Sequence, residues 1–91
     1  MKKAIRLYIT GALQSLFFRQ FIKEHAEKNN IKGFFHLRED GRAEVFLEGE
    51  SDNVNKMIEI CKQGPKHSII RSVEEKQEHL QGFKEFKILT L

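Results

Sequence analysis

A change of hydrophobic periodicity near residue 11 constrains the fold of this chain more than any other feature. Before it, Ile5, Leu7 and Ile9 share one parity of an alternating pattern, which is typical of a half-buried strand. After it the apolar spacing becomes helical, and one helix face would carry Phe18, Phe21, Ile22 and Ala26. The sequence therefore predicts a strand that leads directly into an amphipathic helix.

The junction between this strand and this helix, Gly11 to Arg19, is a potential anion site. The first turn of a helix leaves backbone N–H groups unpaired, and the helix dipole adds partial positive charge there. Arg19 would add a planar guanidinium with five donors. The dipole disfavours a cation at this end of a helix, so we interpret Arg19 as the partner of a phosphate dianion rather than as a solvated charge.

Two strand-like runs form the middle of the chain. The preceding helix is expected to end at Asn29-Asn30, because asparagine tolerates positive φ at a helix C-terminus. Residues 33–39 and 42–49 then follow and are joined at Asp40-Gly41, one of the strongest signals for a tight hairpin. Ala43, Val45 and Leu47 would face the core.

A second amphipathic helix follows the hairpin. Ser51 is the expected cap, and Gly64-Pro65 would end the helix. The apolar positions follow the spacing i, i+3, i+4 and i+7, and they are Val54, Met57, Ile58 and Cys61. On this face, Cys61 is expected to be a buried structural thiol.

The end of the chain completes the predicted architecture. Ile70 and Val73 mark a fourth strand, residues 74–81 are expected to form a loop or a frayed edge, and the last strand is marked by Phe83, Phe86 and Ile88. The element order βαββαβ predicts a ferredoxin-like α+β sandwich, in which two helices pack on one face of an antiparallel sheet.

Composition narrows the function classes without naming one. The chain has 91 residues, the size of one small domain, and 16 Lys and Arg against 13 Asp and Glu give a formal net charge of +3. This mild charge suits small anions and does not demand nucleic acid. One cysteine, no signal-peptide core and no membrane-spanning apolar run lead us to expect a cytoplasmic protein.

The histidines give no sign of a metal centre. They are scattered through the chain without the close spacing of metal ligands, at His25, His36, His67 and His79. We therefore expect no metal and no other cofactor.

The residues of the junction resemble the first loop of the acylphosphatase family, Gly-x-Val-Gln-Gly-Val-x-Phe-Arg. The positions that match this pattern are Gly11, Gln14, Phe18 and Arg19. Gly33 with Asp40-Gly41 is similar to the second-strand hairpin of the family, Gly64-Pro65 to the exit of its second helix, and Phe86-x-Ile88 to its closing strand. The resemblance covers nearly the whole chain and implies a single acylphosphatase-like domain over residues 1–91.

The resemblance implies hydrolysis of the carboxyl-phosphate bond of small acyl phosphates, without metal, cofactor or covalent intermediate. In this family the loop amides and the arginine hold the phosphoryl oxygens, while an asparagine on the second strand orients the attacking water. Carried onto this chain, the phosphate would bind the backbone N–H groups of Ser15, Leu16, Phe17, Phe18 and Arg19. The Arg19 side chain would be the bidentate clamp and a catalytic residue.

This chain departs from the family pattern at two positions. Both anchors of the second-strand motif place the asparagine at position 37, where the chain has Leu37, which cannot hold a water. His36 should lie on the opposite strand face, and Asn29 and Asn30 should lie roughly 15 Å along the helix from Arg19. Ser15 replaces the inner glycine, so a side chain is expected either to adopt positive φ or to narrow the approach to the amides.

These departures leave several functional hypotheses. The first is an acylphosphatase-like hydrolase with weak or absent activity, and the second is a phosphate-binding module without turnover. A third is an RNA-binding domain, because Lys32 to Leu37 partly matches an RNA-recognition aromatic motif, although on the second strand instead of the third. Phe17 would cover the core edge or contact an acyl group, and Leu37 would pack on the helix-facing side of the sheet.

The favoured hypothesis also predicts the partners. We expect a monomer that binds a small acyl phosphate or inorganic phosphate, with neither nucleic acid nor membrane as a partner.

Overall fold

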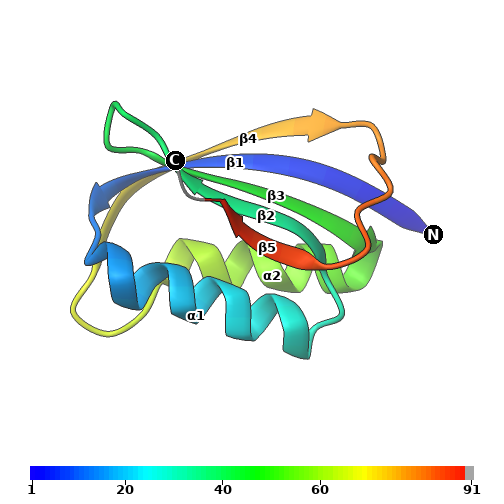
Figure 1. The fold of residues 1–91 in the computed structure, drawn as a ribbon, viewed down its shortest axis with the longest axis horizontal. Coiled ribbons are helices and arrows are strands. Elements are labelled where there is room, and N and C mark those ends of the chain that lie inside the picture. The colour runs from blue at the N-terminus through cyan, green and yellow to red at the C-terminus, as the bar shows by residue number, and fades with distance from the viewer. Residues whose placement is uncertain (90–91) are drawn as a thin grey trace.

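The structure is a computed structural model that describes residues 1–89. It has two layers, a five-stranded sheet and two helices that cover one of its faces (Figure 1). The elements in chain order are β1 (Lys2–Ala12), α1 (Ser15–Lys28), β2 (Lys32–Leu37), β3 (Ala43–Glu50), α2 (Ser51–Gln63), β4 (Ile69–Glu78) and β5 (Phe86–Leu89).

The strand order across the sheet is β4-β1-β3-β2-β5. The first four strands in this order are antiparallel neighbours, whereas β5 pairs with β2 in parallel. The predicted ferredoxin-like α+β fold is thus confirmed, with one difference from a wholly antiparallel sheet. After the β4 edge the chain crosses to the opposite edge through residues 79–85, and it arrives beside β2 running in the same direction (Figure 1).

The core lies between the sheet and the helices. α1 packs over β2 and β5, while α2 packs over β1, β3 and β4. Both predicted helix faces pack against the core, and their buried side chains are Phe18, Ile22, Ala26, Val54, Met57, Ile58 and Cys61. Phe21, also predicted on this face of α1, is only partly buried. Burial raises the pKa of the Cys61 thiol to about 12, as expected of an inert structural cysteine.

Three local predictions were wrong. Phe83 does not belong to the last strand, because β5 begins at Phe86 and the Phe83 ring packs against Phe46. Residues 74–78 are not a loop, because β4 continues to Glu78 along the edge of the sheet. Most of its side chains are exposed, so hydrophobic alternation did not mark its second half. Ser51 is the first residue of α2 instead of its cap, and its hydroxyl donates to the Met1 carbonyl at 2.8 Å.

The predicted turns are confirmed. Asn30, which follows the C-cap residue of α1, has a φ of 55°. The hairpin between β2 and β3 is closed by an N–H···O bond from Arg38 to Arg42 of 2.9 Å, and Gly41 supplies a φ of 88°. The Arg42 N–H donates to the Asp40 carboxylate at 3.0 Å, and this bond holds the pKa of Asp40 below its ordinary value.

Candidate phosphate site and an adjacent groove

Three segments distant in sequence meet at one end of the molecule. β1 and β2 run in the same direction and end there, α1 begins there, and the turn from α2 to β4 lies beside them (Figure 1). The topology therefore brings the predicted anion site, position 37 and residues 64–68 to the same end.

Gly11 fixes the path of the chain into this site. The pairing of β1 with β4 shifts register between Thr10 and Gly11, and a side chain on Gly11 would place its Cβ 2.0 Å from the carbonyl oxygen of Ile69. Only glycine allows the two backbones to approach so closely. Gly11, which matches the family pattern, is thus required in this chain by the packing of β1 against β4.

The first turn of α1 presents backbone donors without a side-chain cap. Gln14 is the N-cap residue and forms no capping hydrogen bond, and the first turn holds no acidic side chain. The Phe18 N–H donates to the Gln14 carbonyl at 2.8 Å, and the Arg19 N–H is next in the helical series. The N–H groups of residues 15–17 therefore have no acceptor within the helix.

The backbone at residue 15 is helical and not left-handed. α1 begins at Ser15, and the described residues other than glycine that have positive φ are Asn30 and His67. A positive φ is thus not imposed by the replacement of the family glycine.

Arg19 lies one turn into α1 and is partly buried. Its neighbour Phe18 is fully buried and packs against Phe35 of β2, with ring centroids 6.0 Å apart. This contact fixes the start of α1 over β2. Within residues 1–89, the arginines that form ion pairs are Arg6, Arg38 and Arg42, so Arg19 carries a charge that no described acidic residue neutralises.

Leu37 is the last residue of β2, opposite Ala43 of β3. It shares a face with the buried Phe35, as predicted, but 42% of it is exposed because the strand ends at the edge of the helix layer. The sequence-based expectation of a packing role is therefore met only in part.

The side chains of His36 and Asn29 are engaged elsewhere. The Nδ1 atom of His36 lies 3.3 Å from Glu44 Oε1 on the open face of the sheet. The Asn29 side chain donates to the His25 carbonyl at 2.7 Å, at the far end of α1. Neither side chain can replace an asparagine at position 37.

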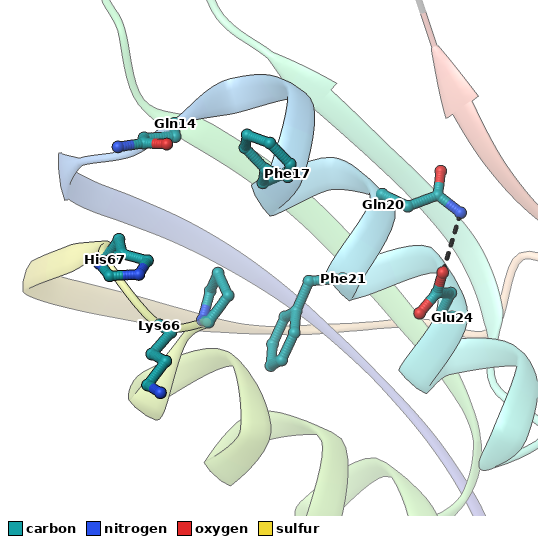
Figure 2. Close-up of a pocket in the computed structure, with 8 residues that line it drawn as sticks. Gln14, Phe17, Gln20, Phe21, Glu24, Lys66 and His67 are labelled. Carbon is teal, nitrogen blue, oxygen red and sulfur yellow. Dashed lines mark hydrogen bonds between the residues drawn. The ribbon is translucent and has the colours of Figure 1, made fainter.

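A groove of about 370 Å³ lies beside the first turns of α1 (Figure 2). We call it the side groove, and its lining residues are Gln14, Phe17, Gln20, Phe21, Glu24, Pro65, Lys66 and His67. Phe17 is 68% exposed, so it does not cover the core edge. No pattern in the sequence indicated this groove, because its second wall is a turn some 50 positions further along the chain.

The phenylalanine rings on the open face of the sheet pack against one another. Phe46 is fully buried, stacked on Phe34 with ring centroids 5.7 Å apart and covered by Phe83 at 5.3 Å. The rings that an RNA-binding sheet would expose are thus packed against one another.

The described part of the chain has neither a metal-binding cluster nor a membrane-spanning helix. No group of three or more His, Cys, Asp or Glu within residues 1–89 is arranged to hold a metal ion. None of the helices in that range is long and apolar enough to cross a membrane.

Comparisons with known proteins agree with this architecture. The acylphosphatase family model matches residues 5–88. An acylphosphatase of Pyrobaculum arsenaticum is 42% identical over 85 residues, which cover 91% of this chain and 90% of that protein. An acylphosphatase of Syntrophus aciditrophicus is 34% identical over 90 residues, covering 98% of this chain and 94% of that protein.

The fold comparison gives the same family. The crystal structure of acylphosphatase from Bacillus subtilis superposes with a TM-score of 0.91 at 27% identity, and the match covers 99% of this chain and 100% of that one. The chain belongs to the acylphosphatase family.

Proposed function

We propose that this protein binds acyl phosphates at the start of α1 and hydrolyses them slowly. The phosphoryl oxygens accept hydrogen bonds from the N–H groups of residues 15–17, and the Arg19 guanidinium provides a bidentate clamp. We call this set the phosphate cradle. It is narrower than the five amides expected from the sequence, because the N–H of Phe18 already donates to Gln14.

The chemistry requires little beyond positioning. The oxygen of a water attacks phosphorus, and the bond between phosphorus and the acyl oxygen breaks, leaving its electron pair on the departing carboxylate. The water's proton passes to the phosphate. Because the transition state spreads charge over the phosphoryl oxygens, fixed donors around them stabilise it most.

One observation supports slow turnover, namely Leu37 at the end of β2. The family asparagine at this position would hold the attacking water, and a leucine side chain has neither donor nor acceptor. Water would then enter the site without a fixed orientation, which removes part of the positioning that drives the reaction. The cradle itself would be unaffected, so phosphate binding should persist.

The test is steady-state hydrolysis of benzoyl phosphate, corrected for spontaneous hydrolysis. We expect slow or undetectable turnover by the native chain and a gain of roughly a hundred- to thousandfold in Leu37→Asn, because a well-placed hydrogen bond in the transition state contributes about 2.7 to 4 kcal/mol. Addition of Arg19→Ala to Leu37→Asn should abolish the gain.

Leu89→Asn is the matched control. Leu89 is 44% exposed and lies at the same end of the sheet, but it is in register with His36 and not with Leu37. It should show no gain. Thermal unfolding must accompany each rate, because a polar side chain at a half-buried position can cost about 1 to 3 kcal/mol. Fast native turnover, or a folded Leu37→Asn variant without gain, would contradict the proposal.

We also propose a cytoplasmic location and a monomeric state. The single cysteine of the chain is buried in the core, which suits a reducing compartment. The cradle and the side groove are built within one chain, so the proposed reaction requires no second copy.

A further inference from the structure

The side groove and the phosphate cradle are separate but contiguous. Gln14 is the N-cap residue that precedes the cradle, and Phe17 supplies one of its amides, yet both also line the side groove. A ligand held at the cradle can therefore extend into the side groove without leaving the protein surface.

The Arg19 side chain and the side groove lie on opposite sides of α1. Positions 17 and 19 are separated by about 200° around a helix, whereas positions 17 and 21 are about 40° apart. Arg19 thus faces away from the Phe17 and Phe21 side of the helix. The second wall of the groove, residues 65–67, comes directly after α2, and α2 packs over β1, β3 and β4. Position 37 lies at the end of β2, the strand that α1 covers.

This arrangement determines where a leaving group can go. In phosphoryl transfer the attacking and leaving oxygens are roughly in line across phosphorus. If water enters from the β2 end, near position 37, the acyl oxygen must face the opposite side of the cradle. The side groove occupies that side.

We infer that the side groove binds the acyl group, and that the chain prefers acyl phosphates with an apolar acyl group about the size of an aromatic ring. The inference rests on the proposed function. The rings of Phe17 and Phe21 point into the space between α1 and residues 65–67 (Figure 2). With Pro65, they form an apolar surface in a volume typical of ligand sites.

The groove walls are held in place before any ligand binds. The N–H and the hydroxyl of Ser68 both donate to the Pro65 carbonyl, at 3.2 and 2.7 Å. This turn maintains a φ of 72° at His67, a conformation that persists only where its surroundings enforce it. On the helix side, the Phe21 ring lies 4.4 Å from the His25 ring. Such preformed walls reduce the entropy lost on binding.

Two stable analogues test the inference by binding alone. Phenacylphosphonate and acetonylphosphonate have CH₂ in place of the bridging oxygen of benzoyl and acetyl phosphate. In amide NMR titrations of the native chain, we expect about tenfold tighter binding of the phenacyl compound, because its ring buries more apolar surface. The signals of Phe21, Lys66 and His67 should respond to the phenacyl compound only.

Substitutions then test whether the preference for the phenacyl compound arises from the side groove. Phe21→Ala should reduce the tenfold preference to less than about threefold, while inorganic phosphate binds as in the native chain, because Phe21 lines the side groove but supplies no amide to the cradle. Leu80→Ala is the control, because Leu80 is 51% exposed and lies in the connection between β4 and β5. It should leave the preference unchanged.

The failures of the two proposals differ. If inorganic phosphate shifts the amides of residues 15–17 but Phe21→Ala retains the full phenacyl preference, the proposed acyl groove is wrong and the cradle stands. The same conclusion follows if the native chain has no preference. If phosphate does not shift the signals of those amides, the proposed phosphate cradle is wrong. The proposed acyl groove is then wrong too, because it depends on the cradle.

Discussion

On the open face of the sheet, the Arg6 guanidinium bonds to the carboxylates of Glu44 and Glu78 and lies 5.3 Å from the centre of the Phe46 ring. At the start of α1, Arg19 has no ion pair with any of residues 1–89, and the neighbouring Phe17 is largely exposed. Both regions thus combine arginine with phenylalanine. On the open face of the sheet, the arginine is paired with carboxylates and the phenylalanine is buried. At the start of α1, the arginine has no ion pair with the described residues and the phenylalanine is exposed.

This difference separates structural from ligand-binding roles. Burial tends to lower the pKa of Arg6, but hydrogen bonds to Glu78 and Glu44 outweigh it and raise the pKa. Glu44 also pairs with His36, so the open face is a connected polar network around a buried aromatic cluster. At the cradle end, the donors of α1 and Arg19 remain available for an external anion.

The largest contrast is expected between two phenylalanines. Phe46→Ala should lower the free energy of unfolding by about 3 to 5 kcal/mol, because it removes a fully buried ring. Phe17→Ala should change it by no more than about 0.5 kcal/mol, because the ring is mostly exposed. Urea unfolding followed by circular dichroism measures both. Similar losses for the two variants would refute the contrast.

The two arginines should show opposite effects on stability and binding. Arg6→Ala should lower the free energy of unfolding by about 2 kcal/mol, because it leaves the carboxylate of Glu44 with weaker partners. Arg19→Ala should leave stability nearly unchanged but weaken phosphate binding roughly ten- to hundredfold, which is the usual effect of losing a charged bidentate contact.

Lys28→Ala is the matched control for Arg19→Ala. It removes an exposed cation from the other end of α1 and should leave phosphate affinity as in the native chain. Isothermal titration calorimetry with phosphate measures the affinity of Arg6→Ala, Arg19→Ala and Lys28→Ala. An equal loss of affinity in Lys28→Ala would mean that phosphate responds to net charge and not to the cradle.

The buried Cys61 in the core should make the free energy of unfolding depend on pH. The pKa of Cys61 is raised from 9.0 to about 12 by burial, so the folded state keeps a proton that the unfolded state loses above pH 9. Stability should therefore fall between pH 9 and pH 12, with a Cys61 contribution of about 1.4 kcal/mol per pH unit. Cys61→Ala should lack this contribution, so its free energy of unfolding should fall less steeply than that of the native chain. Parallel curves for the two proteins in urea unfolding would contradict the prediction.

The smallest effect is expected for RNA. Because Phe46 is buried and Phe34 is stacked on it, the open face should show no saturable binding of mixed-sequence single-stranded RNA at physiological salt. Fluorescence anisotropy with labelled RNA is the measurement. Micromolar, sequence-dependent binding that shifts the Phe34 and His36 signals would instead assign a ligand role to this face.

Local patterns were enough for most of the fold. The alternation around Leu7 and the helical spacing around Phe18 and Met57 report burial on one face, which is a property of each segment alone. Edge strands lack this signal. The second half of β4 is exposed on both sides, so its pairing with β1 was not readable from its residues.

Only the part of the candidate site formed by residues close together in sequence was predictable. Gly11, Gln14 and Arg19 are close together in sequence, so their spacing identified the loop and the family. The bond between the Phe18 N–H and Gln14, which reduces the set of free amides, depends on where the helix begins. Helix boundaries are determined by cap geometry and are poorly specified by residue type.

The sequence by itself determined the family, the two helices and the loss of a polar side chain at position 37, because these follow from residue identity and short-range spacing. Only the tertiary structure decided which arginine is neutralised and which is open, and that Phe17 lines a groove with Pro65 and His67 instead of covering the core. These depend on contacts between segments far apart in the chain. Such contacts are specified by the packing of the whole domain, and no local pattern encodes them.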